Sequence, residues 1–242
     1  MKKLKNKSVL VVAAHPDDEV LGCGATLAKL ADNGSAVNVV FMSNGVDSRD
    51  IKKSKVKKLI KQRKKAAKRS CRILGINKPN FVGLADNKLD KYPLIKIVKI
   101  VEKFIKRYSP NTIYTHFEND LNIDHQLVHD SVVTACRPEK KNPVKNLFFF
   151  EVPSSTEWKI NFKTKHFNPN WFEDVTSTKK RKFEALKAYS VELKKWPHPR
   201  SLKAINALIL WRGATAGLEA AEAFILGRKI LMFIIILEFI VT

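Results

Sequence analysis

The chain has 242 residues, of which 45% are hydrophobic, so it can bury the core of one large domain. Lys and Arg number 45 against 23 Asp and Glu, and the net charge of +22 favours an anionic partner or, in a basic proteome, only a solvated surface. Three cysteines without close spacing argue against a disulfide framework and against a cysteine-based zinc site. We therefore expect one cytoplasmic domain over residues 1–242, with reduced thiols and no secretory signal in the short basic start.

The predicted elements alternate between strands and helices. Short apolar runs predict strands, and apolar residues at helical spacing predict helices. In chain order they are a strand at 8–13, a helix at 18–30, a strand at 37–42, a basic helix ending at Leu74, a strand at 81–84, a helix at 94–108, a strand at 112–115 and a helix through Cys136. This order predicts an α/β fold that is Rossmann-like, with three α/β/α layers and a mainly parallel sheet.

The later part of the chain predicts a strand at 147–152, an edge strand at 172–175 and helices at 179–193 and 202–212. The first strand is not followed by a glycine-rich dinucleotide fingerprint, because Gly22 and Gly24 fall inside the predicted helix, so we expect no nicotinamide cofactor. The apolar segment 230–241 is shorter than the about 20 residues that span a membrane. It fits a packed helix, an added strand, an oligomer contact or an anchor at a membrane surface.

Two polar clusters follow predicted strands. His15, Asp17, Asp18 and Glu19 come directly after the first strand, and a second cluster at 116–129 begins where the fourth strand ends. In open α/β sheets, ligands bind at the carboxyl ends of the strands. We therefore expect the two clusters to meet at one edge of the sheet.

Two imidazoles and one carboxylate suit a catalytic metal site. His15, Asp18 and His125 can converge on one point and leave a position open for water. Zinc lowers the pKa of bound water to roughly 7, and Asp17 remains beside it as a general base. Each cluster alone is also explained by a turn or a helix cap, and their matching places at two strand ends favour the metal site.

The segments Ala14-His15-Pro16-Asp17-Asp18-Glu19 and Asn122-Ile123-Asp124-His125 resemble the motifs of the PIG-L/LmbE family of zinc-dependent deacetylases. The similarity runs from about residue 8 to about residue 224, and the segments 151–158 and 197–201 resemble a bacterial branch of the family. The resemblance implies removal of the acetyl group from an N-acetylated amino sugar of the N-acetylglucosamine type. The apolar tail at 225–242 falls outside the resemblance.

Carried over position by position, the resemblance places the metal ligands on His15, Asp18 and His125 and the general base, later the proton donor, on Asp17. Zinc is the implied metal, although two His and one carboxylate also suit ferrous iron.

Two more residues of the second motif are candidate catalytic groups. Asp124 is expected to orient a ligand imidazole, or else to cap the helix. Asn122 stands where many members carry a His that helps to stabilise the oxyanion, and its amide can donate a hydrogen bond but carries no charge. His116 or His198 is the candidate replacement for that imidazole.

The candidate substrate contacts are Arg49, Arg63, His198 and Arg200. Arginine forms bidentate pairs with phosphate and carboxylate groups, which an anionic substituent of the substrate would supply. Family members commonly carry Glu three residues after the Arg that matches Arg63. Here Ala66 stands at that position, so we expect Arg63 to lack its support.

The implied partner is a small acetamido sugar or a sugar conjugate. One alternative is a catalytically impaired glycan- or sugar-binding member of the same fold, and its only support is that Asn122 stands in place of an imidazole. Another is a hydrolase of a different amide or ester. The charge favours nucleic acid, but no binding motif is present, so we expect no nucleic-acid partner. A homo-oligomer and a peripheral membrane contact through the C-terminal tail both stay open.

Overall fold

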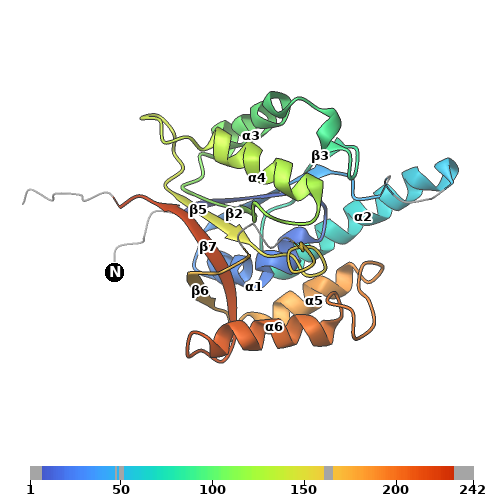
Figure 1. Ribbon diagram of the computed structural model, residues 1–242, viewed down its shortest axis with the longest axis vertical. Helices are drawn as coiled ribbons and strands as arrows, with labels where there is room; N and C mark the ends of the chain where they lie inside the picture. Colours follow the sequence, from blue (N-terminus) through green and yellow to red (C-terminus); the bar gives the residue numbers. More distant parts are fainter. Residues whose placement is uncertain (1–6, 47, 49–51, 161–165, 232–242) are drawn as a thin grey trace, which may run out of the picture.

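The computed structural model describes residues 7–46, 48, 52–160 and 166–231 (Figure 1). Within them the strands are β1 Ser8–Ala13, β2 Ala36–Ser43, β3 Asn80–Leu84, β4 Thr112–His116, β5 Asn146–Phe150, β6 Trp171–Asp174 and β7 Ala221–Lys229. They form one seven-stranded sheet in the order β3-β2-β1-β4-β5-β7-β6. The neighbours from β3 to β5 pair in parallel, while β7 runs antiparallel to β5 and β6. The mainly parallel sheet is thus confirmed.

Helices cover both faces of this sheet (Figure 1). They are α1 Asp18–Asp32, α2 Lys53–Leu74, α3 Leu94–Tyr108, α4 Ile123–Ala135, α5 Lys179–Ala188 and α6 Leu202–Ala214, with a 3₁₀ turn, η1, at Leu89–Lys91. Apolar residues of α3 and α4 form the core on one face, and those of α1, α2, α5 and α6 form the core on the other. The predicted three-layer α/β/α architecture is therefore confirmed.

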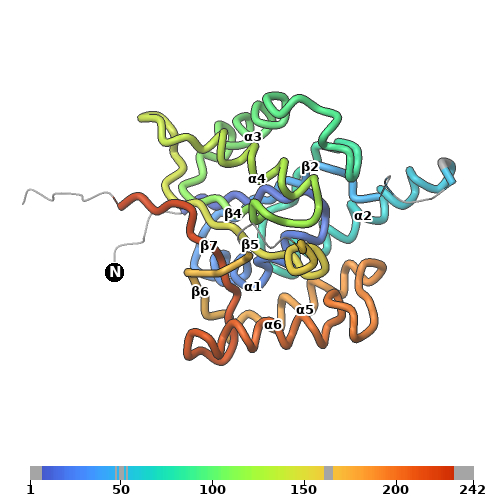
Figure 2. The backbone as a smooth tube through the Cα atoms, viewed as in Figure 1, coloured from blue at the N-terminus to red at the C-terminus, as the bar shows by residue number. Residues whose placement is uncertain are grey.

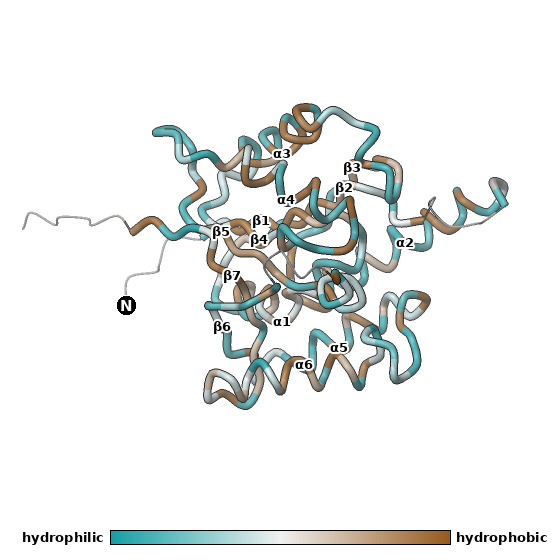
Figure 3. Tube along the Cα trace, in the orientation of Figure 1, coloured by the Kyte–Doolittle hydropathy of each residue, from teal (hydrophilic) through white to brown (hydrophobic). Residues whose placement is uncertain are grey.

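The middle of the sheet consists mostly of apolar residues (Figure 3), and an apolar core lies on each of its faces. In β1, residues 9–13 are all buried, because β2 and β4 pair with its edges and helices cover its two faces. A strand buried on both faces reads as a continuous apolar run, which is the pattern that predicted it. The carboxyl end of β1 therefore meets the polar motif at a fixed place in the middle of the sheet.

Glycine is required at two positions for different reasons, a close approach at Gly22 and a left-handed helix end at Gly75. Gly22 of α1 lies so close to the ring of Phe150 in β5 that a Cβ there would be 2.3 Å from a ring carbon. Gly75 ends α2 in the left-handed conformation with φ 76°, which glycine adopts without steric cost. The helix end predicted at Leu74 is confirmed.

A buried ion pair supports a kink in α1. Cys23 has non-helical backbone angles, φ −145° and ψ 17°. Glu222 of β7 accepts hydrogen bonds from the backbone N–H of Ala25 (3.1 Å) and of the next residue (2.7 Å). Lys182 of α5 bonds to Glu222 at 2.6 Å and donates to the carbonyl of Leu21 at 2.7 Å. The side chains of Lys182 and Glu222 thus form hydrogen bonds with backbone groups on both sides of the kink.

Two features of the C-terminal part differ from the sequence-based expectations. Residues 225–229, assigned to the tail, are the second half of β7, which lies between β5 and β6 (Figure 2). The strand was hard to predict because the charged residue Glu222 interrupts its apolar pattern. Glu222 is nevertheless buried, because it forms an ion pair with Lys182 of α5. The helix predicted at 179–193 ends at Ala188 instead. Most of the segment 230–241 lies outside the described residues.

Cys23, Cys71 and Cys136 are free and buried, as reduced thiols were expected to be. No helix in the described part of the chain is both long enough and apolar enough to cross a membrane.

Candidate metal centre

The turn after β1 is strained and firmly held. Asp17 has φ 129°, a backbone conformation that costs free energy for any residue with a side chain. Its carbonyl accepts a hydrogen bond from Leu21 N–H at 2.9 Å, and its N–H donates to the Glu19 carboxylate at 3.1 Å. Burial raises the pKa of Glu19 to about 7, even though Tyr189 and Ser70 donate to its carboxylate. These hydrogen bonds therefore hold Asp17 and Glu19 in fixed positions.

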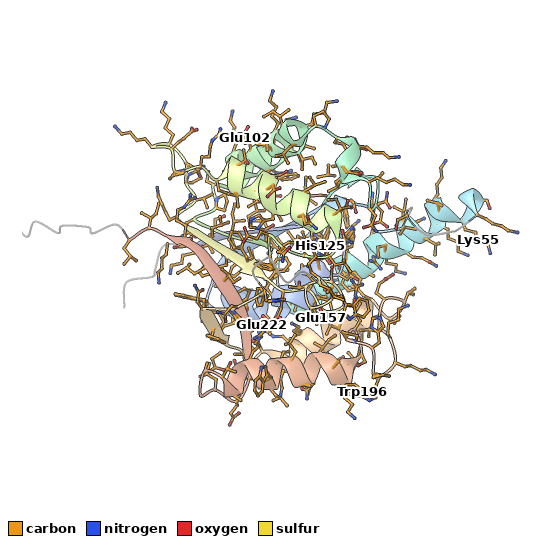
Figure 4. All side chains as sticks on the ribbon, viewed as in Figure 1. Lys55, Glu102, His125, Glu157, Trp196 and Glu222 are labelled. Atoms are coloured by element: carbon orange, nitrogen blue, oxygen red, sulfur yellow. The ribbon has the colours of Figure 1, made fainter. Side chains whose placement is uncertain are left out.

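His15, Asp18 and His125 meet at the carboxyl edge of β1 and β4, where the sequence had predicted a metal site. Their ligand atoms all lie within 4.8 Å of one another. His15 Nδ1 is 3.2 Å from His125 Nε2 and 3.3 Å from Asp18 Oδ2, which is 3.4 Å from His125 Nε2. All three side chains are buried, and Figure 4 shows His125 in the interior between the helical layers.

The chemistry of this donor set fits a divalent metal ion. Two imidazole nitrogens face each other, and they hydrogen-bond only if one of them carries a proton. Asp18 Oδ1 is buried and accepts no hydrogen bond from the described residues. A metal ion would accept the lone pairs of both nitrogens and of the carboxylate, which is the three-ligand arrangement of catalytic zinc sites.

Asp120 orients His125 from the other side, and the sequence-based site had not included it. Its Oδ1 lies 3.2 Å from His125 Nδ1, and the hydroxyl groups of Ser155 and Thr156 donate to its carboxylate. Burial opposes ionisation, but the charge and hydrogen bonds around Asp120 outweigh it and lower its pKa to about 2. A signal was present, since Asp120 lies in the second polar cluster.

Two carboxylates face the outer nitrogen of His15. Its Nε2 is 3.0 Å from Asp86 Oδ1 and 3.1 Å from Asp124 Oδ2. The Asp124 carboxylate also accepts hydrogen bonds from the backbone N–H groups of Asn87 and Leu89. Such partners fix the ring orientation and tautomer of a ligand imidazole. Asp124 lies where the predicted orienting role requires, and Asp86, which follows β3 at the same edge, was not predicted.

His116 is buried behind His125. Its ring stacks on His125 with centroids 3.9 Å apart, and its Nε2 accepts a hydrogen bond from Ala14 N–H at 2.8 Å. Burial keeps the pKa of His116 well below its ordinary value. His116 is thus held by a backbone hydrogen bond, and its ring supports that of His125.

Asp17 lies in the same turn as Asp18 and faces two arginines. Its Oδ2 is 3.4 Å from Arg63 Nη2 and 3.3 Å from Arg200 Nη1. Arg63 Nη1 forms an ion pair with Glu192, in the segment after α5. The expectation that Arg63 lacks support was therefore wrong, because Glu192 supplies the carboxylate that position 66 does not. Burial raises the pKa of Asp17, against the opposing charges of both arginines.

The remaining predicted site residues lie as follows. His198 accepts a hydrogen bond from Arg200 N–H at 3.0 Å and packs against Trp158. Asn122 caps α4, because its Oδ1 accepts from the backbone N–H of Asp124 at 2.9 Å. Arg49 lies outside the described residues.

Substitution of Asp120 by Asn is expected to weaken metal affinity about 10- to 100-fold, since the Asn side chain lacks the charge that orients and polarises His125. Competition with a chromophoric chelator measures the affinity. Asp130→Asn is the control, because Asp130 is exposed on α4. Equal affinities of wild type and Asp120→Asn would contradict the orienting role.

Metal affinity is expected to rise with pH between about 6.5 and 9. Burial disfavours the charged form of His125, but the carboxylates of Asp18 and Asp120 outweigh it and raise its pKa to about 9. In the metal-free protein, protonated His125 therefore stabilises the fold below the unfolded-state pKa of about 6.5, and that stabilisation is lost as pH rises through 9. A metal must displace this proton, so affinity gains about tenfold per pH unit for each proton released. Calorimetry in buffers of different ionisation enthalpy counts the protons, and a count of zero at pH 7.5 would refute the expectation.

Comparisons with known proteins show what the chain is similar to. Residues 10–136 match the family model described as PIG-L: GlcNAc-PI de-N-acetylase. The chain is 30% identical over 176 residues to the uncharacterized deacetylase YaiS of Escherichia coli K12, covering 71% of this chain and 83% of that protein. It is 29% identical over 144 residues to a probable N-acetyl-alpha-D-glucosaminyl L-malate deacetylase 2 of Bacillus cereus, covering 57% of this chain and 66% of that protein.

Among solved structures, GalB of Pseudomonas putida KT2440, a 4-carboxy-2-hydroxymuconate hydratase, superimposes with a TM-score of 0.74. The match covers 94% of this chain and 99% of GalB at 22% identity. This likeness shows a shared fold, and proteins that share a fold often differ in reaction.

Proposed function

This chain belongs to the PIG-L family, and from that membership we propose that it is a zinc-dependent deacetylase acting on an N-acetylated amino sugar of the N-acetylglucosamine type. The observation that carries the proposal is the buried group His15, Asp18 and His125 with the carboxylate of Asp17 beside it. The names of the E. coli and B. cereus relatives support deacetylation, and the latter names a glucosaminyl substrate. Ferrous iron suits the same ligands.

In this proposal His15, Asp18 and His125 hold the metal. When bound, the ion supplies Lewis acidity, which polarises an amide carbonyl and lowers the pKa of water. Asp120 and Asp124 keep the two imidazoles in the orientation that directs a ring nitrogen at the ion.

Asp17 moves the protons. Its carboxylate takes a proton from the attacking water as the water oxygen bonds to the acetyl carbon, and it later gives that proton to the nitrogen as the C–N bond breaks. The products are acetate and the free amine. Burial raises the pKa of Asp17, which strengthens it as a base, while Arg63 and Arg200 hold the carboxylate in place.

Asn122 is the proposed donor to the oxyanion. Its Oδ1 is used as the cap of α4, and its Nδ2 is the group that can donate. Donation from a neutral amide in place of an imidazolium favours slower turnover. A glycan-binding protein with little or no turnover is therefore the second candidate function.

Acetate release tests the proposal. Purified protein is stripped of metal, reloaded with zinc or with ferrous iron, and offered N-acetylglucosamine and its phosphorylated, malyl-linked and oligomeric derivatives. We expect release from at least one substrate by the reloaded protein and none by the stripped protein. Tight binding of a sugar without acetate release would favour the second candidate, and release that does not depend on metal would refute the first.

A further inference from the structure

We propose that Trp158, together with His198 and Arg200, forms a subsite for a second sugar ring next to the acetamido sugar, so that the substrate is an oligosaccharide. The inference rests on the proposed function. Trp158 is 45% exposed on the loop after β5, two residues after Thr156, whose hydroxyl donates to Asp120.

One face of the Trp158 indole is accessible to a ligand. Its only ring contact among the described residues is with His198, at a centroid distance of 5.4 Å and an interplanar angle of 73°. A near-perpendicular contact sets the edge of one ring against the other, so it covers at most one face of the indole. The negative face of an aromatic ring attracts the C–H groups on the apolar face of a pyranose, which carry partial positive charge.

A chain of direct contacts joins this indole to the catalytic carboxylate. His198 Nδ1 accepts a hydrogen bond from Arg200 N–H at 3.0 Å, and Arg200 Nη1 lies 3.3 Å from Asp17 Oδ2. A sugar ring on Trp158 and the ring whose acetamido group faces Asp17 would thus lie along one surface lined by His198 and Arg200. This placement suits an adjoining sugar of the same chain.

The loop that presents Trp158 is tied to the metal centre. Arg200 Nε donates to Ser154 Oγ at 2.7 Å, and Thr156 Oγ1 donates at 2.7 Å to Asp120, the partner of His125. The carboxylate of Glu157 accepts from the backbone N–H of Ser154 at 2.6 Å. A loop that is already held in place loses little conformational entropy when a ligand binds. This favours a ligand-binding role for the half-exposed indole of Trp158.

The other three tryptophans are less suited to this role. Lys229 lies over the ring of Trp171 and Lys203 over that of Trp196, at 4.4 and 4.6 Å from the centroids. Trp211 is 63% exposed, but it lies near the far end of α6, about 14 Å along the helix axis from the Arg200 end. It provides a matched control.

The test compares N-acetylglucosamine with its β(1→4)-linked disaccharide and trisaccharide as substrates. We expect wild type to have a higher kcat/KM for the oligomers. Trp158→Ala should lower the ratio of disaccharide to monosaccharide kcat/KM about 10- to 100-fold, the scale of removing one aromatic stacking partner from a flat ligand. Trp158→Phe should retain most of the ratio, and Trp211→Ala should leave it unchanged.

Binding supplies a second measurement that does not depend on turnover. In the Asp17→Asn background, the disaccharide should quench tryptophan fluorescence, and the additional Trp158→Ala change should remove that quench and weaken binding measured by calorimetry. If acetate is released but the oligomers hold no advantage over the monosaccharide, the subsite is refuted and the deacetylase stands. If no acetate is released, the proposed function fails, and a disaccharide affinity that Trp158→Ala does not change would refute the subsite as well.

Discussion

Asp17→Asn is expected to lower kcat for acetate release about 10²- to 10⁴-fold, the usual contribution of a positioned acid–base group. The Asn side chain keeps the size of Asp17 and can still accept hydrogen bonds from Arg63 and Arg200, but it cannot take a proton from water. Metal content should not change, because Asp17 is not among the three converging ligands. Steady-state kinetics on the reloaded protein, with metal analysis, measures both quantities.

The matched control is Asp130→Asn, which removes an exposed carboxylate from α4 and should leave kcat within twofold. The wild-type pH profile adds a further comparison. Burial raises the pKa of Asp17, so activity should fall on the acid side as this carboxylate is protonated. A variant that keeps near-wild-type kcat would remove Asp17 from the proposed mechanism and leave the metal site as it is.

Lys182→Met is expected to lower the free energy of unfolding by about 3–5 kcal/mol, the effect of breaking a buried ion pair from one side. The melting temperature should fall by about 6–20 °C in a domain of this size. The reason is that Glu222 keeps its charge in a site where both side chains are almost fully buried, and the carbonyl of Leu21 loses its donor. Denaturant and thermal unfolding measure the change.

Lys180→Met is the control, since Lys180 is exposed on the same helix and should change stability by less than about 0.5 kcal/mol. The double variant Lys182→Met/Glu222→Leu should recover part of the loss, because it leaves no unpaired buried charge. It does not restore donors and acceptors to α1, so recovery should be incomplete. A loss below 1 kcal/mol in Lys182→Met would show that the kink holds without the pair.

The local pattern of the sequence was enough to predict the order of strands and helices from β1 to α6 and the convergence of His15, Asp18 and His125. The short apolar run before His15 predicted a buried strand, and parallel strands bring their carboxyl ends to one edge. The motif containing His125 follows β4, which the structure pairs with β1, so the two motifs meet at that edge as expected. Both predictions use information within a few residues of the chain and one rule of topology.

Only the tertiary structure decided which side chains support that centre. Glu192 takes the role expected at position 66, although it comes from a different segment of the chain, and Asp86 reaches His15 from the loop after β3. The partner of Lys182 lies 40 residues away on a strand that the apolar pattern did not reveal. Buried polar groups need partners, but any element nearby in space can supply them. Local periodicity therefore predicts most of the strands and helices, while the pairing of charges across segments is fixed only when the layers pack.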